Sequence, residues 1–264
     1  FGERGLSERI QHAFLSVPRH LFVERYREYG SRAWHSVMDR AEGAPAHGPA
    51  PPGRDASVDE TTLWRHLPAI YRNDGLGIYG LDEDDAVATI SQPFLVLWML
   101  EHLGVEPGMA VLEVGAGSGW NAGLLGALVS PDGTVDSVEI IAELAERARR
   151  GIARAGLTNV RIIHGDAGAA VEGRVGDNDA YDRVVFTAGT HDLPGYLYRE
   201  VRKGGLLELV LKCPGGGDLL VCMRKRDDHF QSEGMRACEF VPLTGRARLQ
   251  KLDPLALENF APWP

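Results

Sequence analysis

The hydrophobic positions of this chain follow two alternating periods from residue 88 onward. Short apolar runs rich in β-branched residues, such as Ala110 to Val114 and Tyr181 to Thr187, have the length of buried parallel strands. Between such runs lie segments with apolar residues three and four positions apart. In Ala142 to Ala155 this spacing places Leu144, Ala148 and Ile152 on one face of a helix. Strands that alternate with helices predict an α/β fold, with a mostly parallel sheet and helices on both faces.

The same patterns predict the remaining elements. Residues 24–40 are mixed and are compatible with a short helix, and Pro18 and Pro68 are expected to end the helices that precede them. We expect helices at 6–17, 59–67, 94–103, 120–129, 142–155 and 193–201, and strands at 110–114, 134–138, 160–164, 181–187, 206–211, 219–225 and 237–243.

The alternation is missing at both ends of the chain. Residues 41–55 are rich in Ala, Pro and Gly and have no large apolar side chain, so they predict a mobile surface loop. We therefore divide the chain into three parts. They are an N-terminal helical segment with this flexible loop (1–87), a core (88–243) and a C-terminal tail (244–264).

Three glycines follow the first core strand at alternate positions: Gly115, Gly117 and Gly119. A strand that runs into such a loop must turn sharply, and glycine tolerates positive φ and has no Cβ to keep a ligand away. The helix that follows points its N-terminus at whatever binds in the loop. A tight turn without a ligand would use the same residues, so the loop alone does not decide between the two.

An acidic residue favours the interpretation of the glycine loop as a ligand site. Glu139 ends the next strand, about 20 residues on, where a carboxylate accepts hydrogen bonds from a ribose diol in doubly wound sheets. The glycine spacing is G-x-G-x-G, whereas dinucleotide sites use G-x-G-x-x-G, and position 120 holds Trp. We therefore expect a nucleoside cofactor with an amino-acid tail, such as S-adenosyl-L-methionine, with S-adenosyl-L-homocysteine as product.

Hydroxyl groups precede the first core helix. Thr89 and Ser91 lie just before Pro93, which suits the first turn of a helix. Anions are favoured at a helix N-terminus, so these hydroxyls could bind a substrate carboxylate. A helix cap formed by Ser91 explains the same residues, and on these residues alone it is the favoured interpretation.

Composition argues against certain binding partners and indicates the cellular compartment. The chain has 264 residues, of which 44% are hydrophobic, and a net charge of −9, which argues against nucleic acid or an anionic membrane. The longest apolar run, Phe94 to Leu100, is far shorter than the ~20 residues of a membrane span. Three cysteines without a C-x-x-C pair and nine histidines without ligand spacing predict reduced thiols and no metal site. We expect a cytoplasmic monomer.

A series of motifs carries a resemblance to a known family. They are VPRHLFV (17–23), TISQP (89–93), VLEVGAGSGWNA (111–122), VDSVE (135–139), HGDA (164–167), YDRVVFTA (181–188), LPGYL (193–197), RKGG (202–205) and EFVPL (239–243). Their order and spacing resemble the protein-L-isoaspartate O-methyltransferase family over most of the chain. The resemblance implies a Rossmann-like class I S-adenosylmethionine-dependent methyltransferase fold and a carboxyl O-methyltransferase activity. Its substrate would be a peptide or protein with an aspartyl or isoaspartyl carboxylate, and the methyl ester would close to a succinimide (aspartimide).

The resemblance also implies roles for individual residues. The glycines would wrap the methionine part of the cofactor, Glu139 would hold the ribose, and Asp166 would accept from the adenine amino group. Ser91 would be the catalytic residue that orients the acceptor carboxylate. The cofactor-binding set is Glu113, Gly115, Ala116, Gly117, Gly119, Glu139, Ile140, Asp166 and Ala167, and the substrate-binding set is Thr89, Ile90, Ser91 and Gln92.

Three positions depart from the family pattern. Gln92 stands where the family usually has Ala, Phe94 where it has His, and Trp120 where Tyr is common. Gln92 and the approach IYRND (70–74) resemble a branch that methylates aspartate in ribosomally made peptides. We therefore lean to peptide tailoring, with general isoaspartyl repair as the alternative. An NAD-dependent oxidoreductase and a non-catalytic binding module are the competing hypotheses from other classes.

Overall fold

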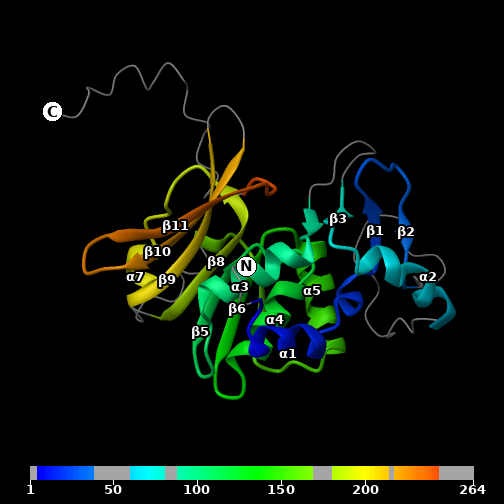
Figure 1. Cartoon of the computed structure of the whole chain (residues 1–264), viewed down its shortest axis with the longest axis horizontal. Helices are drawn as coiled ribbons and strands as arrows, with labels where there is room; N and C mark the ends of the chain where they lie inside the picture. Colours follow the sequence, from blue (N-terminus) through cyan, green and yellow to red (C-terminus); the bar gives the residue numbers. More distant parts are fainter. Residues whose placement is uncertain (1–4, 39–59, 81–87, 169–179, 214–216, 244–264) are drawn as a thin grey trace.

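A computed structural model describes residues 5–38, 60–80, 88–168, 180–213 and 217–243. Its centre is a seven-stranded sheet with the order β11-β10-β9-β8-β5-β6-β7. Its strands are β5 (Ala110–Val114), β6 (Thr134–Glu139), β7 (Val160–His164), β8 (Tyr181–Thr190), β9 (Val201–Lys212), β10 (Asp218–Lys225) and β11 (Phe230–Cys238). The strands from β7 to β9 are parallel, and β10 and β11 are antiparallel to their neighbours. The predicted mostly parallel α/β sheet is therefore confirmed (Figure 1).

The chain reverses its direction across the sheet at β5. It runs outward from β5 through β6 to β7, then returns to place β8 on the other side of β5. Such a switch point leaves a crevice at the carboxyl ends of the strands, where ligands of open α/β sheets bind. The glycine loop begins at this end of β5.

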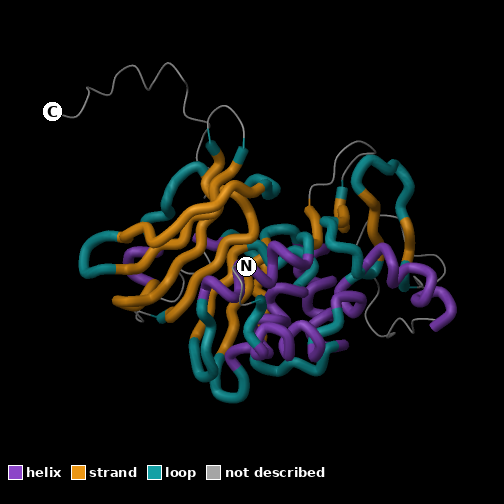
Figure 2. The backbone as a smooth tube through the Cα atoms, viewed as in Figure 1, coloured by secondary structure: helices purple, strands orange, loops and turns teal. Residues whose placement is uncertain are grey.

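Helices pack on the two faces of the sheet. One face carries α3 (Pro93–Leu103), α4 (Trp120–Val129) and α5 (Ala142–Arg154), with α1 (Glu8–Ser16) on α4. The predicted face of α5 is buried, with Leu144, Ala148 and Ile152 each at most 5% exposed. The described residues on the opposite face include the short helix α7 (Leu197–Glu200), whose Leu197 joins a second apolar cluster. Figure 2 shows most strands of the large sheet together at the left of the view, and the strands of a second, smaller group at the right.

A smaller sheet lies apart from the large one (Figure 1). Its order is β2-β1-β3-β4, with β1 (Arg25–Glu28), β2 (His35–Ser36), β3 (Leu76–Tyr79) and β4 (Ala88–Ile90). Helix α2 (Glu60–Ile70) and the single turn η1 (Arg19–Phe22) complete this part. The boundary drawn between residues 87 and 88 runs through this sheet, because β4 pairs with β3. The loop 41–55 and the tail 244–264 lie outside the described residues.

Several boundaries differ from the sequence predictions. The described part of 24–40 holds β1 and β2 instead of a helix, because the pairing of β1 with both β2 and β3 outweighs a weak local preference. Helix α2 runs past Pro68 to Ile70, although the missing N–H of this proline costs the helix one backbone hydrogen bond. Helix α7 covers only 197–200 of the predicted 193–201, and β9 already begins at Val201.

The last strand is the largest error. It spans Phe230–Cys238 instead of 237–243 and pairs with β10 as an edge strand. Nearly all of its side chains are exposed, so it has no buried alternation for a hydrophobic pattern to reveal. Residues 240–243 instead cross towards the end of β8, where Gly189 bonds to Val241 and Leu243 through backbone groups.

Candidate functional site

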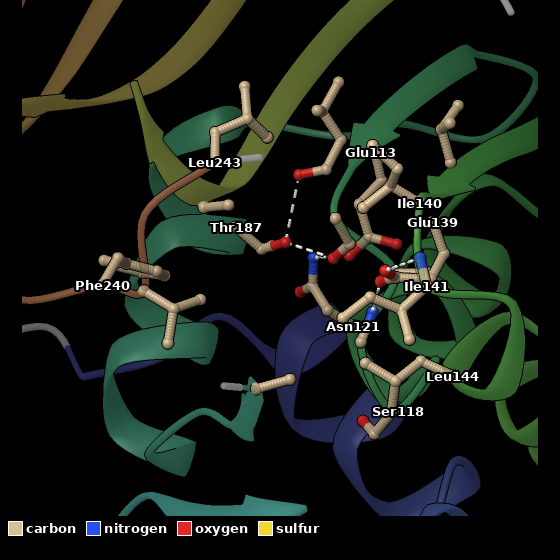
Figure 3. A pocket seen from close by; sticks show the side chains of 18 of the residues that line it. Glu113, Ser118, Asn121, Glu139, Ile140, Ile141, Leu144, Thr187, Phe240 and Leu243 are labelled. Atoms are coloured by element: carbon tan, nitrogen blue, oxygen red, sulfur yellow. Dashed lines mark hydrogen bonds between the residues drawn. The ribbon is translucent and has the colours of Figure 1, made fainter. Parts of the chain in front are cut away.

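A cavity of about 420 Å³ opens at the carboxyl end of β5, which lies in the size range of small-ligand sites. It is lined by the ends of β5, β6 and β8, by the turn before α3 and by residues 240–243. Figure 3 shows Phe240 and Leu243 on one side of this cavity and Ile140, Ile141 and Leu144 on the opposite side. Most of the predicted site residues line this cavity. They are Thr89, Ile90, Ser91, Glu113, Gly115, Ala116, Gly117, Glu139, Ile140, Asp166 and Ala167.

The glycine loop needs its glycines for different reasons. Gly115 has a φ of 101°, and a Cβ there would lie 2.6 Å from Thr187 Oγ1. Gly117 has a φ of 53°, and a Cβ there would meet only Thr89 O, at 3.7 Å. The first glycine is therefore required by a close approach to β8, and the second mainly by its backbone conformation.

Glu139 holds the loop through backbone groups. Its Oε2 accepts from Gly117 N at 2.8 Å and its Oε1 from Ile141 N at 2.9 Å. Burial raises the pKa of this carboxyl, and the backbone donors partly oppose that rise. A carboxylate has about four lone-pair sites, so Glu139 can still accept from a ligand's hydroxyl groups.

Gly119 is placed differently from the other two glycines. It does not line the cavity. A Cβ added at this position would lie 2.9 Å from Ala148 Cβ, so the lack of a side chain lets α4 approach α5. Trp120 lines the cavity, but its ring packs at 6.1 Å from Phe14 and its Nε1 donates to Val17 O at 3.1 Å. Much of the indole therefore fills the space beside the N-terminal segment, which weakens the steric argument against a pyrophosphate.

Glu113 brings a second carboxyl to the cavity. It is fully buried, and it accepts from Asn121 Nδ2 at 2.7 Å and from Ser137 Oγ. Burial raises the pKa of Glu113 to about 7, although both donors oppose that rise. This group therefore changes charge near neutral pH, and a cationic ligand beside it would favour the ionised form.

The third strand end carries Asp166 and Ala167. Asp166 Oδ1 accepts from Gly168 N at 3.0 Å, which fixes the turn that leaves β7. Ala167 and Ile140 present apolar surface to the cavity beside it. A flat heterocycle with an exocyclic amino group would suit this corner.

The turn before α3 lies against the glycine loop. Thr89 and Ile90 belong to β4, Ser91 follows, and all three line the cavity. Gln92 is the N-cap of α3 and does not line the cavity, and its side chain makes no cap hydrogen bond; Asn73 Oδ1 instead accepts from Phe94 N in the first turn at 2.9 Å. The proposed substrate role of Gln92 stays a prediction.

Residues 240–243 close the cavity on the far side. Phe240 N donates to Asp218 Oδ2 at 2.8 Å, and Lys212 Nζ bonds to the same carboxylate and to Phe240 O. The EFVPL motif contributed to the family resemblance, but these residues were expected in a strand and not at the site. Their position depends on the distant pair Lys212–Asp218, which the sequence pattern does not indicate.

Several other cavity residues were not predicted. Thr187, at the end of β8, donates from Oγ1 to Gly115 O and to Val114 O, the latter at 3.2 Å (Figure 3). Asn121 faces Glu113 from the first turn of α4. The motifs VVFTA and GWNA contain both residues, so their place after a strand and at a helix start could have indicated them.

The described residues also bear on metal binding and on membrane insertion. No group of three or more His, Cys, Asp or Glu side chains within them is arranged to hold a metal ion. None of the helices that the structure describes is long and apolar enough to cross a membrane.

Known proteins share this sequence pattern. The sequence model of the family described as Protein-L-isoaspartate(D-aspartate) O-methyltransferase matches residues 68–248. A protein-L-isoaspartate O-methyltransferase of Pyrococcus horikoshii is 34% identical over 245 residues, which cover 90% of this chain and 86% of the relative. Protein-L-isoaspartate O-methyltransferase 2 of Rhodopseudomonas palustris is 37% identical over 161 residues, covering 61% of this chain and 71% of the relative.

Solved structures share the fold. A protein-L-isoaspartate O-methyltransferase superimposes with a TM-score of 0.66 at 24% identity, over 91% of this chain and 62% of the other. A Plasmodium falciparum protein, described as a beta-aspartate methyltransferase in complex with S-adenosyl-L-homocysteine, gives a TM-score of 0.63 at 16% identity. This match covers 90% of this chain and 91% of the other. At these identities the likeness concerns the fold.

Proposed function

The chain belongs to the protein-L-isoaspartate O-methyltransferase family, and we propose that it methylates the side chain of an isoaspartyl residue in a peptide or protein. As a member of this family it is an S-adenosylmethionine-dependent carboxyl O-methyltransferase. The relatives described above are named for isoaspartate, and none is named for tailoring a ribosomal peptide. We therefore propose the isoaspartyl acceptor first. The substrate expected for peptide tailoring is included as a comparison in the experiment that tests this proposal.

The cavity fits the cofactor on three counts. Glu139 offers lone pairs to a ribose diol, Glu113 offers a carboxyl that can ionise beside an ammonium group, and Ile140 offers apolar surface to a purine. Asp166 and Ala167 would border the adenine edge. When bound, S-adenosylmethionine supplies a methyl group on a positively charged sulfur, which a carboxylate oxygen can take in one displacement.

The acceptor side of the cavity supports the reaction without a general base. A free carboxyl has a pKa of about 4, so the acceptor is ionised at neutral pH and needs no proton removed. The chain's task is then to place that carboxylate, and alignment of two bound reactants can contribute up to roughly 7–11 kcal/mol. We propose that the Ser91 hydroxyl donates to the acceptor oxygen and that Thr89 borders it.

One observation carries this proposal. The hydroxyl-bearing turn and the glycine loop line the same cavity, and Thr89 O lies 3.7 Å from the Cβ position of residue 117. A nucleoside held by Glu139 and an acid held by the turn would therefore meet. A dinucleotide enzyme would not need two hydroxyl groups at this place, so the NAD-dependent alternative is not favoured.

The test uses one peptide in two forms. The full chain is incubated with labelled S-adenosylmethionine and with a peptide that contains isoaspartate, or the same peptide with normal aspartate. We expect label in the isoaspartyl peptide only, followed by loss of the ester and formation of a succinimide. A third arm offers a cyclised ribosomal precursor with an internal aspartate.

The outcomes separate the hypotheses. Label in the normal aspartate of the cyclised precursor, with none in the isoaspartyl peptide, would replace the repair proposal by tailoring. Calorimetry then distinguishes the other classes. Binding of S-adenosylhomocysteine without any methyl transfer would indicate a binding module, and binding of NAD alone would indicate the oxidoreductase.

A further inference from the structure

Arg19 is a cation buried beneath the acceptor turn. Its side chain has no exposed surface, although it comes from η1 in the N-terminal segment. Among the described residues, no carboxylate lies within salt-bridge distance of it. Burial lowers the pKa of Arg19 to about 10, so the guanidinium remains charged at neutral pH. A buried charge of this kind is retained only where other groups compensate for its lost hydration.

Backbone carbonyls supply that compensation. The Nη2 atom donates to Ser91 O at 2.9 Å, to Asp74 O at 3.1 Å and to Ile90 O at 3.3 Å. The Nη1 atom donates to Ile70 O. Two of the four carbonyls belong to the turn that carries the acceptor hydroxyls, and the other two belong to the end of α2 and the approach to β3.

The same guanidinium also contacts the other side of the site. Its central carbon lies 5.3 Å from the centre of the Trp120 ring, which is a cation–π distance. Trp120 is the first residue of α4 and directly follows the glycine loop. Arg19 therefore contacts both the backbone of the acceptor turn and the helix that the glycine loop begins.

From these contacts we propose that Arg19 is a positioning residue for the acceptor: it sets the place of the Ser91 backbone, and hence of its hydroxyl, relative to the glycine loop. The proposal rests on the proposed function, since it assumes that Ser91 meets the acceptor carboxylate. Arg19 does not line the cavity, so its effect on the reaction is indirect. Lysine cannot replace it, because an ammonium is a point charge and cannot reach carbonyls on several sides.

A second arginine provides a matched control. Arg183 holds the far end of α3, where its Nε donates to Leu103 O at 2.7 Å and its Nη2 to Gly104 O at 3.0 Å. Burial lowers the pKa of Arg183 as well. Both arginines thus bind backbone carbonyls at the two ends of the same helix, but only Arg19 touches the acceptor turn.

The experiment compares Arg19→Lys with Arg183→Lys in the full chain. We expect Arg19→Lys to lower kcat by about thirtyfold while the Kd for S-adenosylhomocysteine changes by less than about threefold, because a small displacement of the aligned group is costly. Arg183→Lys is expected to lower the melting temperature with less than about a twofold change in kcat. Guanidinium at millimolar concentration should restore part of the turnover of Arg19→Ala, but none of that of Ser91→Ala.

Hydrogen exchange gives a reading that does not depend on activity. In Arg19→Lys the backbone amides of 88–92 should exchange faster, while those of 115–119 keep the wild-type rate. If the wild type methylates no isoaspartyl peptide but this exchange pattern appears, the proposed function fails and Arg19 still holds the turn. Equal kcat losses in the two lysine variants, or cofactor affinity that falls in parallel with kcat, would overturn the proposal.

Discussion

The two halves of the cavity are built in different ways. The cofactor half consists of the ends of β5, β6 and β7. Two of its carboxylates, Glu139 and Asp166, accept from backbone groups close to strand ends, and the third, Glu113, accepts from side chains of β6 and α4. The acceptor half consists of the turn 88–91 and the segment 240–243, which come from outside the parallel strands. Single side chains from distant segments hold them: Arg19 for the first, and Lys212 with Asp218 for the second.

This difference has a functional consequence. The cofactor half is fixed by the sheet itself, so most damage to it should appear in cofactor affinity. The acceptor half is fixed by a few long-range contacts, so damage to it should appear in turnover or acceptor KM while the cofactor still binds. Four substitution experiments test this division, beginning with the largest expected effect.

Gly115→Ala tests the cofactor half. A Cβ at φ 101° would lie 2.6 Å from Thr187 Oγ1, so either the Thr187 hydroxyl must rotate away from its bond to Gly115 O or the loop must move off β8. We expect affinity for S-adenosylhomocysteine to fall at least about 100-fold, equivalent to about 2.7 kcal/mol. Gly117→Ala is the control, since its Cβ has space, and it should lose about tenfold or less. Isothermal calorimetry measures both, and equal losses would show that backbone conformation alone decides.

Ser91→Ala tests the acceptor half. A hydrogen bond to a charged group contributes about 1.5–3 kcal/mol, so we expect kcat to fall by about thirtyfold. The cofactor is held by the other half, and its Kd should stay within about twofold of the wild type. Steady-state kinetics at saturating cofactor checks the first value and calorimetry the second. An unchanged kcat would remove Ser91 from the mechanism.

The cofactor half was largely predictable from the sequence. A strand, a glycine loop, a helix and an acid at the next strand end occur at nearly fixed spacing, because adjacent parallel strands of one sheet bring them together. Gly119 marks the limit of this logic. Its spacing suggested the ligand, whereas its contact is with Ala148, and spacing alone does not tell which side of the loop a missing Cβ would face.

The acceptor half was predictable only in part. Thr89 and Ser91 were found from their place before α3, but Phe240 to Leu243 were expected in a strand. Their position requires the pair Lys212–Asp218 and a glycine at 189, where a Cβ would lie 2.6 Å from the Lys212 side chain. Phe240 and Asp218 are 22 positions apart, and Gly189 and Lys212 are 23 apart, so local hydrophobic periods carry no information about these contacts.

Lys212→Met tests the second anchor of the acceptor half. It leaves the 5% exposed Asp218 carboxylate without its cation, so the segment 240–243 should loosen. We expect acceptor KM to rise about tenfold and the protein to be destabilised by about 3 kcal/mol. Lys203→Met breaks an exposed pair with Asp227 and should change neither quantity measurably. The division fails if cofactor affinity falls as much as acceptor KM rises.

The smallest expected effect comes from the charge of Glu113. Binding of the cofactor should depend on pH through this group, and binding of the acceptor should not. Burial raises the pKa of this carboxyl to about 7, whereas the unfolded chain ionises near its ordinary value of 4.5. Between these values the folded state keeps a proton that the unfolded state has released. Stability must therefore fall as pH rises through this window and level off above about 7.

Cofactor binding should change in the opposite direction over the same pH range. S-adenosylhomocysteine carries an ammonium group, which an ionised Glu113 attracts and a neutral one does not, so its affinity should rise about three- to fivefold from pH 6 to pH 8. Glu113→Gln keeps the hydrogen-bonding shape without the titration and should flatten both curves. Calorimetry and denaturant titration at matched pH measure them. Since general loosening of the fold would weaken binding and stability together, opposite slopes in the wild type assign the effect to this carboxyl, and parallel slopes would exclude it.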